Sequence, residues 1–309
     1  MSEITRSPFS IQVAVDGSKN SLDAALLIRS LPLPPGSRVN IVGVLDNGRA
    51  PYEELLRQGV EKVEQTLAEQ GVECSSYLLH GHTVKGLLEF ADEHHPDLIV
   101  VGAHGLHETL KILLGGVAQE VVEYARWPVL VMRSPAPEVR RVLLAVDGSP
   151  YSQLSAEYLA QFPLPDQTEV HVMHVLPPLP DTERLAAMMG FSEHPKSAFQ
   201  PPPEMLVDEQ QKLAEEQNAR AVVQAAGQIL EASGIQSKKI LVRGDPANEI
   251  ISFAEAQRID LIVTGSRGLS AIKGWWWGSV SRKLIHYSPC SVLCVRGRPE
   301  SHEEEGSPT

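Results

Sequence analysis

The sequence contains an internal repeat, which indicates that the chain folds into two copies of the same structural unit. The segment I-Q-V-A-V-D-G-S, ending at Ser18, returns as V-L-L-A-V-D-G-S, ending at Ser149. A second motif, G-A-H-G at 102–105, returns as G-S-R-G at 265–268. The first motif recurs after 131 positions and the second after 163, so the second copy carries a 32-residue insertion. With 309 residues, the chain has room for about two domains of ordinary size.

Each copy alternates short apolar runs with segments of helical spacing. The first copy has five such runs, at 11–15, 39–44, 72–79, 98–101 and 129–132. Continuous apolar strands separated by amphipathic helices are typical of a parallel sheet with helices on both faces. We therefore predict an α/β fold of two tandem Rossmann-like domains, each with a five-stranded parallel sheet. The residues predicted to share the buried face of the helix at 52–70 are Leu55, Leu56, Val60, Val63 and Leu67.

Composition places the domain boundaries in proline-rich segments. We predict domain 1 at 8–134 and domain 2 at 138–297, joined by the linker S-P-A-P. The insertion falls around 177–206, where the stretch from Pro177 to Pro203 favours a surface loop over a functional lid. The tail at 298–309 holds three consecutive glutamates and is predicted to be disordered.

Composition also excludes several classes of protein. A formal net charge of −12 argues against a nucleic-acid partner, since phosphates need a basic surface. We find neither an apolar run of about 18 residues nor a basic-then-apolar leader, so we expect a cytoplasmic protein without a membrane partner. The three cysteines lack C-x-x-C spacing, so we predict no protein-bound metal, and we expect Cys290 and Cys294 to flank a strand and pack there.

The glycines of the second copy have the spacing G-x2-G-x9-G-S, formed by Gly265, Gly268, Gly278 and Ser279. An apolar strand precedes them and a helical segment starts at Ser279. Glycine lets the backbone approach a ligand closely, and the amides at a helix start attract phosphate. The spacing matches neither the P-loop nor the dinucleotide fingerprint. The residues alone leave two interpretations open, a phosphate cradle and a purely structural turn.

Asp147 stands at the end of the first strand of its copy, and Gly265 at the end of the fourth. In open parallel sheets, ligands bind beyond the carboxyl ends of the strands, where the strand order reverses. If the two strands are neighbours, the carboxylate and the glycine loop border one crevice. The alternative is that Asp147 only forms the turn before the Ser149 helix cap.

These motifs, together with the ending S-P-C-S-V-L-C-V-R, resemble the universal stress protein domain twice over. The resemblance covers nearly the whole chain apart from the insertion and the tail, and it implies the adenine nucleotide alpha hydrolase-like fold. It also implies that ATP or another adenine nucleotide binds, with Mg²⁺ or Mn²⁺ held mainly by phosphates and water. The residues carried over are Ala145, Val146 and Asp147 at the base and ribose, Val175 at the adenine, and Thr264, Gly265, Ser266, Arg267, Gly268, Gly278, Ser279, Val280 and Ser281 around the ribose and phosphates.

The first copy keeps the framework of this motif but lacks two hydroxyls. Ala103 replaces a small hydroxyl residue and Gly116 replaces a Ser or Thr. Losing a hydroxyl to a charged phosphate costs about 1 to 3 kcal/mol, or about one to two decades in affinity. We expect this site to bind more weakly or to be a vestige. The residues that remain are Asp16, Val44, Gly102, Gly105 and Gly115.

The resemblance also implies how the copies associate. Fifth strands commonly pair between domains in this family, so 129–131 and 292–294 are expected to join the halves, with chains forming a homodimer.

Three functions remain open. The first is a nucleotide-responsive binding module in stress response. The second is a slow ATPase or nucleotidyl-transfer enzyme, in which Arg267 would stabilise developing charge, although the second loop offers no obvious base. The third is a dimeric scaffold that binds no nucleotide. We favour the first, so enzymatic activity is expected to be weak at most, and we assign no catalytic residue.

Overall fold

The computed structural model describes residues 7–46, 50–69, 71–105, 114–135, 138–178, 209–268 and 278–296. Within these ranges the chain forms ten strands and eight helices. The N-terminal half contains β1 (Ser10–Val15), α1 (Lys19–Ser30), β2 (Arg38–Leu45), α2 (Ala50–Ala68), β3 (Glu73–His80), α3 (Thr83–His94), β4 (Leu98–Gly102), α4 (Gly116–Tyr124) and β5 (Val129–Met132). The C-terminal half contains β6 (Arg141–Ala145), α5 (Pro150–Gln161), β7 (Glu169–Leu176), α7 (Glu209–Ala232), β8 (Ser237–Arg243), α8 (Pro246–Gln257), β9 (Leu261–Gly265), α9 (Ser279–Tyr287) and β10 (Ser291–Val295).

All ten strands belong to one sheet, in the order β3-β2-β1-β4-β5-β10-β9-β6-β7-β8. Every neighbouring pair within a half is parallel, and the single antiparallel pair, β5 with β10, joins the halves. Its register places Leu293 opposite Leu130, in the segments expected from the sequence. In each half the first three strands follow one another toward the outer edge of the sheet. The fourth and fifth strands lie on the other side of the first strand, which is β1 or β6. The predicted fold class, two tandem Rossmann-like α/β units, is confirmed.

The helices begin where local chemistry predicts. Ser18 and Ser149 are N-caps whose hydroxyls accept from the amides of Ser21 and Ser152, and Pro150 occupies the first helical position of α5. A cap of this kind satisfies a backbone donor that the helix geometry leaves without an internal partner. The first helix of each half is therefore anchored directly behind the repeated A-V-D-G-S motif.

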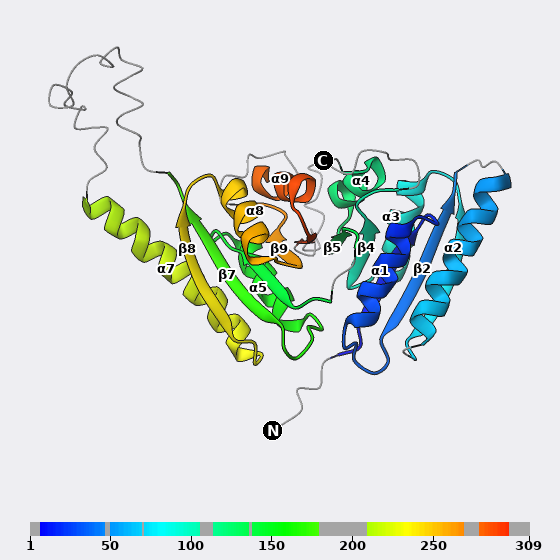
Figure 1. Cartoon of the computed structure of the whole chain (residues 1–309), viewed down its shortest axis with the longest axis horizontal. Coiled ribbons are helices and arrows are strands. Elements are labelled where there is room, and N and C mark those ends of the chain that lie inside the picture. The colour runs from blue at the N-terminus through cyan, green and yellow to red at the C-terminus, as the bar shows by residue number, and fades with distance from the viewer. Residues whose placement is uncertain are drawn as a thin grey trace, which may run out of the picture.

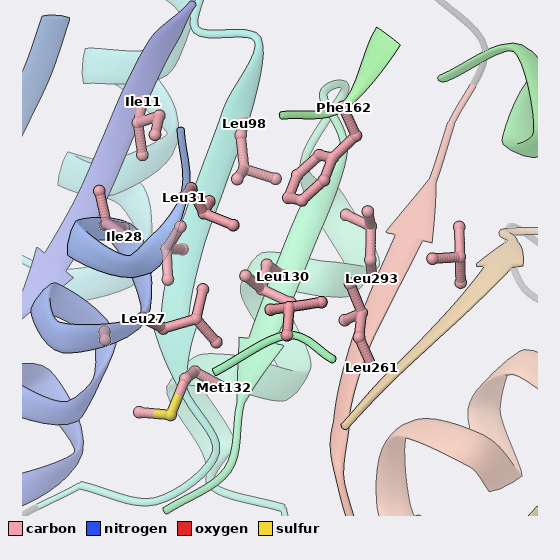
Figure 2. Packing of buried hydrophobic residues seen from close by; sticks show 14 of the residues in the cluster. Ile11, Leu27, Ile28, Leu31, Leu98, Leu130, Met132, Phe162, Leu261 and Leu293 are labelled. Carbon is pink, nitrogen blue, oxygen red and sulfur yellow. The ribbon is translucent and has the colours of Figure 1, made fainter. Parts of the chain in front are cut away.

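The helices cover both faces of the sheet, and each face has a core that runs through both halves. One core combines residues of α1 and α2 with residues of α5 and α7, and the other combines α3 and α4 with α8 and α9. Figure 1 shows β5 near the centre of the molecule, with α2 and α7 at opposite ends. Figure 2 shows Leu130, Phe162 and Leu293 in one packed group at the joint. The halves therefore bury apolar surface against each other as well as within themselves.

Aromatic side chains extend this joint. Phe9 of the N-terminal half packs edge-on against Phe162, with ring centroids 6.1 Å apart. The hydroxyl of Tyr158 donates to the carbonyl of Asp97 across the halves at 2.9 Å. Burial raises the pKa of Tyr158 well above its usual value, which keeps the phenol protonated as a donor.

One predicted core position is wrong. Leu56, Val60, Val63 and Leu67 are buried as expected, but Leu55 is 40% exposed. Leu55 precedes Leu56 by one residue and so points about 100° away around the helix, at the edge of the buried stripe. A side chain at Gly17 would lie 2.8 Å from the Leu55 carbonyl oxygen, so the backbone at Leu55 packs against the β1–α1 turn.

The buried cysteines are structural. Cys290 lies just before β10, as expected, whereas Cys294 lies inside β10 rather than beside it. Both side chains are buried, and this burial raises the pKa of each thiol to about 12. At neutral pH the thiolate is therefore nearly absent, which leaves both groups unreactive.

In the described segments, no helix combines the length and the apolar content needed to span a bilayer. Most of the predicted insertion, residues 179–206, lies outside the described residues, as does the predicted tail.

Candidate functional site

The predicted C-terminal site lies where β6 and β9 end side by side. The two strands are parallel neighbours, with Ala145 opposite Thr264. The strand order reverses between them, since β7 and β8 continue on one side and β10 lies on the other. Asp147 follows β6, and Gly265 is the last residue of β9. The structure therefore places both motifs at the switch point where ligands of open parallel sheets bind.

The turn after β6 orients the Asp147 carboxylate. Its Oδ1 accepts a hydrogen bond from the Ser149 amide at 2.9 Å. Gly148 makes this turn possible, because its φ of 84° lies in the left-handed region that glycine tolerates. A Cβ atom at Gly268 would overlap Asp147 Oδ2, so this glycine lets the loop pass against the carboxylate.

The glycine loop is fixed to the end of the sheet by its own backbone. The Ser266 amide donates to the Val295 carbonyl at 2.9 Å, and the Ser266 carbonyl accepts from the Gly278 amide at 3.0 Å. The buried hydroxyl of Ser281 lies 3.1 Å from the carbonyls of Ser266 and Gly278 and donates to one of them. These bonds hold the start of α9 directly over the end of β9.

The N-terminus of α9 presents donors without a side-chain cap. Gly278 is the N-cap residue and makes no side-chain cap bond, and the amides of Ser279, Val280 and Ser281 form the first turn. Helix geometry leaves such amides without internal partners, and the helix dipole adds a partial positive charge there. A Cβ atom at Gly278 would lie 3.5 Å from the Gly268 nitrogen, so the helix start lies against the loop that faces Asp147.

Two further polar side chains, Thr264 and Arg267, come from the end of β9 and the loop after it. The guanidinium of Arg267 is half-exposed and lies 5.9 Å from the centre of the Tyr151 ring. A Cβ atom at Gly265 would lie 2.8 Å from the Tyr151 carbonyl oxygen, so close packing with α5 requires glycine there. The buried Thr264 hydroxyl lies 3.3 Å from the Gly265 carbonyl oxygen.

The side assigned to the base is formed by β6 and β7. The Val146 amide donates to the Met173 carbonyl at 2.9 Å, which extends the strand pairing beyond Ala145. Val175 is half-buried near the end of β7. His174 was missed by sequence reasoning, although its Nδ1 lies 2.8 Å from the Val146 carbonyl oxygen. The repeat offers no signal for it, since Gly43 occupies the corresponding position of the first copy.

The predicted site residues are thus brought to one end of the sheet, with one difference in role. The Ser279 side chain is exposed at the helix start, whereas Ser281 is buried and holds the loop. Main-chain amides, a hydroxyl and a guanidinium suit a phosphate, while a carboxylate suits the hydroxyls or amine of a nucleoside. Among the described residues, no three His, Cys, Asp or Glu side chains gather in a way that could hold a metal ion.

The first copy repeats the backbone of this arrangement. Asp16 Oδ1 accepts from the Ser18 amide at 2.9 Å and from the Ser21 hydroxyl at 2.5 Å. A Cβ atom at Gly105 would lie 2.9 Å from Asp16 Oδ2, and one at Gly102 would lie 2.9 Å from the Cβ of Asn20. The carboxylate and the glycine loop therefore face each other as they do in the second copy. Val44, the counterpart of Val175, is buried in β2.

The helix start of the first copy lacks the hydroxyls of the second. The Gly115 amide donates to the Ala103 carbonyl at 2.8 Å, and Gly115 caps α4 without a side-chain bond. A Cβ atom at Gly116 would meet no atom within 4 Å, so the missing hydroxyl residue would fit there. Ala118 takes the place of Ser281, a third lost hydroxyl that sequence reasoning missed.

Both halves of the chain match a known protein family. The model of the "Universal stress protein family" matches residues 10–133, 138–197 and 194–296. Universal stress protein Mb2028c of Mycobacterium bovis is 25% identical over 317 residues, covering 94% of this chain and 98% of that protein.

A solved structure shares the fold over nearly the whole chain. A universal stress protein from Archaeoglobus fulgidus superimposes with a TM-score of 0.61 at 20% identity, covering 94% of this chain and 98% of that one. Another universal stress protein, solved in complex with cAMP, is 28% identical and covers 41% of this chain and 98% of that one, with a TM-score of 0.33. Since the family model matches nearly all of the described sequence in both halves, the chain belongs to the universal stress protein family.

Proposed function

We propose that this chain is an ATP-binding universal stress protein, a regulatory module in stress response whose association with partners responds to a bound adenine nucleotide. The observation that carries the proposal is the convergence at the end of β9. There the uncapped start of α9, the glycine loop and the Asp147 carboxylate adjoin one another. This arrangement matches the two ends of a nucleotide, with anionic phosphates at the helix start and a polar nucleoside at the carboxylate.

In the proposed complex the amides of Ser279, Val280 and Ser281 bind phosphate oxygens, together with the Ser279 hydroxyl and the Arg267 guanidinium. Asp147 accepts from the ribose or the adenine, and Val175 packs against the base. Gly265, Gly268 and Gly278 let the loop and the helix start pack closely around the site, because a Cβ atom at each would approach a neighbouring group of the protein.

A divalent cation, Mg²⁺ or Mn²⁺, fits this proposal as a phosphate-bound ion. The described residues offer no cluster of carboxylates or imidazoles for it, and Asp147 already accepts from the Ser149 amide. The cation would therefore take its ligands mainly from phosphate oxygens and water, as Mg²⁺ commonly does at nucleotide sites. It would neutralise phosphate charge that the main-chain amides alone do not balance.

The proposed role is binding rather than catalysis. Hydrolysis requires a group that orients water, as well as cations at the developing charge. Arg267 supplies one cation, but no carboxylate, amide or imidazole side chain occurs among the described loop residues 264–268. We therefore expect ATP turnover to be slow.

The test is the ligand content of freshly purified protein. We expect an adenine nucleotide to be released by heat and identified by mass spectrometry, and Mg·ATP to bind the emptied protein in calorimetry. Absence of both retention and binding would favour the scaffold function instead. A steady turnover above about 1 per second would favour the enzyme, because that rate approaches ordinary catalysis.

The first copy is proposed to bind more weakly. Its carboxylate and loop are in place, but Ala103, Gly116 and Ala118 remove three hydroxyls. A stoichiometry near one nucleotide per chain is the corresponding expectation.

We also propose that the chain forms a homodimer through the face of α4 and α9. The exposed large hydrophobic side chains of the described residues include Val117 and Tyr124 of α4 and Tyr287 of α9. Figure 1 shows α4 and α9 on the same side of the sheet, on either side of its centre. The exposed Glu120 of α4 and Arg282 of α9 carry opposite charges. A twofold axis would therefore bring α4 of each chain onto α9 of the other with complementary charge.

Sedimentation equilibrium tests this interface. The wild type is expected at twice the chain mass of 33.8 kDa, Arg282→Glu at the mass of one chain, and the double variant with Glu120→Arg at twice the mass again. A monomeric wild type, or a dimer that Arg282→Glu leaves intact, would contradict the interface.

A further inference from the structure

The residue that follows the fifth strand of each half is an arginine. Arg133 comes directly after β5, and Arg296 directly after β10. The pair was not assigned any role by sequence reasoning. Both side chains cross the joint and end at a helix of the opposite half.

Arg133 donates from Nη2 to the carbonyls of Ile285 and His286, at 2.7 and 2.9 Å. These carbonyls belong to the last turn of α9, where helix geometry leaves oxygens without internal partners. Arg296 makes the reciprocal contacts, donating from Nη2 to Val122 at 2.8 Å and Glu123 at 2.6 Å in the last turn of α4. Each helix whose N-terminus forms a candidate phosphate site thus has its C-terminus capped from the other half.

We propose that Arg133 is a positioning residue for the nucleotide site of the C-terminal half, so that this site is complete only when the N-terminal half is docked. The inference rests on the proposed function for its ligand, but the cap itself is independent of nucleotide.

The physical reason lies in the length of α9. The helix has nine residues, and helices this short are marginal without tertiary anchors. Its first turn is held by the Gly278 amide, which donates to the Ser266 carbonyl, and by the Ser281 hydroxyl, which lies 3.1 Å from the carbonyls of Ser266 and Gly278. At the other end, Arg133 satisfies two carbonyls and places a positive charge at the negative end of the helix dipole. Loss of this cap lets the last turn fray and lets the phosphate-binding amides move.

The environment of Arg133 makes the contact specific. Its side chain is partly withdrawn from water, and this burial lowers its pKa, although a guanidinium keeps its charge at neutral pH. The Arg133 amide also donates to the buried Ser291 hydroxyl at 3.1 Å, which fixes the backbone from which the side chain starts. Arg133 is therefore held both at its backbone amide and at its guanidinium.

Arg296 offers a matched control because it makes the same kind of cap on the other helix. Arg296 also lies on the same half as the C-terminal site, and its pKa is lowered by burial and, to a smaller extent, by Arg267. If proximity to the phosphates mattered most, Arg296 would be the more important residue. If capping of α9 matters most for nucleotide affinity, Arg133 is the more important residue.

The experiment compares full-length Arg133→Met, Arg133→Lys and Arg296→Met with the wild type, by hydrogen exchange and by calorimetry with Mg·ATP. We expect Arg133→Met to speed amide exchange in α9 and not in α4, and Arg296→Met to do the reverse. The affinity for Mg·ATP is expected to fall about three- to tenfold in Arg133→Met and to stay within about twofold in Arg296→Met. Arg133→Lys, which keeps the charge, is expected to recover part of the loss.

Two results would overturn the proposal. One is that each Met variant speeds exchange in the helix of its own half, or that neither variant speeds exchange in α4 or α9. The other is a wild type that binds Mg·ATP while Arg133→Met binds it equally well, or while Arg296→Met loses as much affinity. If the wild type binds no nucleotide while the two Met variants show the crossed exchange pattern, the proposed function is refuted and the cap remains established.

Discussion

Gly268→Ala is expected to weaken Mg·ATP binding by about 10- to 100-fold. The added methyl group would overlap Asp147 Oδ2, so the carboxylate must turn away or the loop must move. Turning it also disturbs the bond from the Ser149 amide to Asp147 Oδ1. Hydrogen bonds to charged groups contribute about 1.5 to 3 kcal/mol, which corresponds to the expected range. Isothermal titration calorimetry with emptied protein measures the change.

The first copy provides the matched control. A methyl group at Gly105 would lie 2.9 Å from Asp16 Oδ2, so Gly105→Ala makes the same kind of contact at the other switch point. We expect this variant to keep the affinity of the C-terminal site within about twofold, with a thermal unfolding midpoint close to that of Gly268→Ala. Equal loss of binding in both variants would show that the two sites act together, and a larger loss in Gly105→Ala would show that the N-terminal copy is the main site.

Leu130→Ala and Leu293→Ala are each expected to lower the free energy of unfolding by about 2 to 5 kcal/mol. Both side chains are completely buried, and they face each other in the antiparallel pair that joins the halves. Truncation removes apolar contact and leaves a cavity that the two-sided packing of the joint prevents from collapsing. Leu213→Ala, at a side chain that is 59% exposed on α7, is the control and should change the free energy by less than about 0.5 kcal/mol.

Urea unfolding followed by circular dichroism and by fluorescence distinguishes a shared core from two independent ones. Since both cores contain residues of both halves, we expect one coincident transition, which each variant shifts as a whole. The double variant should lose less than the sum of the single losses, because the two residues are neighbours. Separate transitions, of which Leu130→Ala moves only one, would contradict a cooperative joint.

Much of the fold was predictable because its signals are local. Continuous apolar runs predicted the strands, and Ser149 predicted the start of α5. The repeat added the information that the chain contains two corresponding units, with the same motifs at corresponding strand ends. The neighbouring positions of β6 and β9, on which the site depends, were left open by the sequence and come from the strand order of the sheet.

The remaining features depend on side-chain directions and long-range contacts. A sequence does not distinguish the exposed Ser279 from the buried Ser281, because the difference arises from the turn that closes onto Ser266. The arginine caps join residues more than 150 positions apart, as in the bond from Arg133 to Ile285. A signal for them did exist, since Arg133 and Arg296 occupy corresponding positions of the repeat.

The antiparallel pairing of β5 with β10 has a consequence for how the molecule is put together. A single-copy domain with this strand order would leave its fifth strand open to any matching edge, including that of an identical chain. Here the fifth strand of each half pairs with the fifth strand of the other half of the same polypeptide. The N-terminal half therefore meets a C-terminal half at this joint and not a second N-terminal half. The N-terminal half can therefore lack hydroxyls that the C-terminal half keeps while it continues to pack against that half and to cap α9.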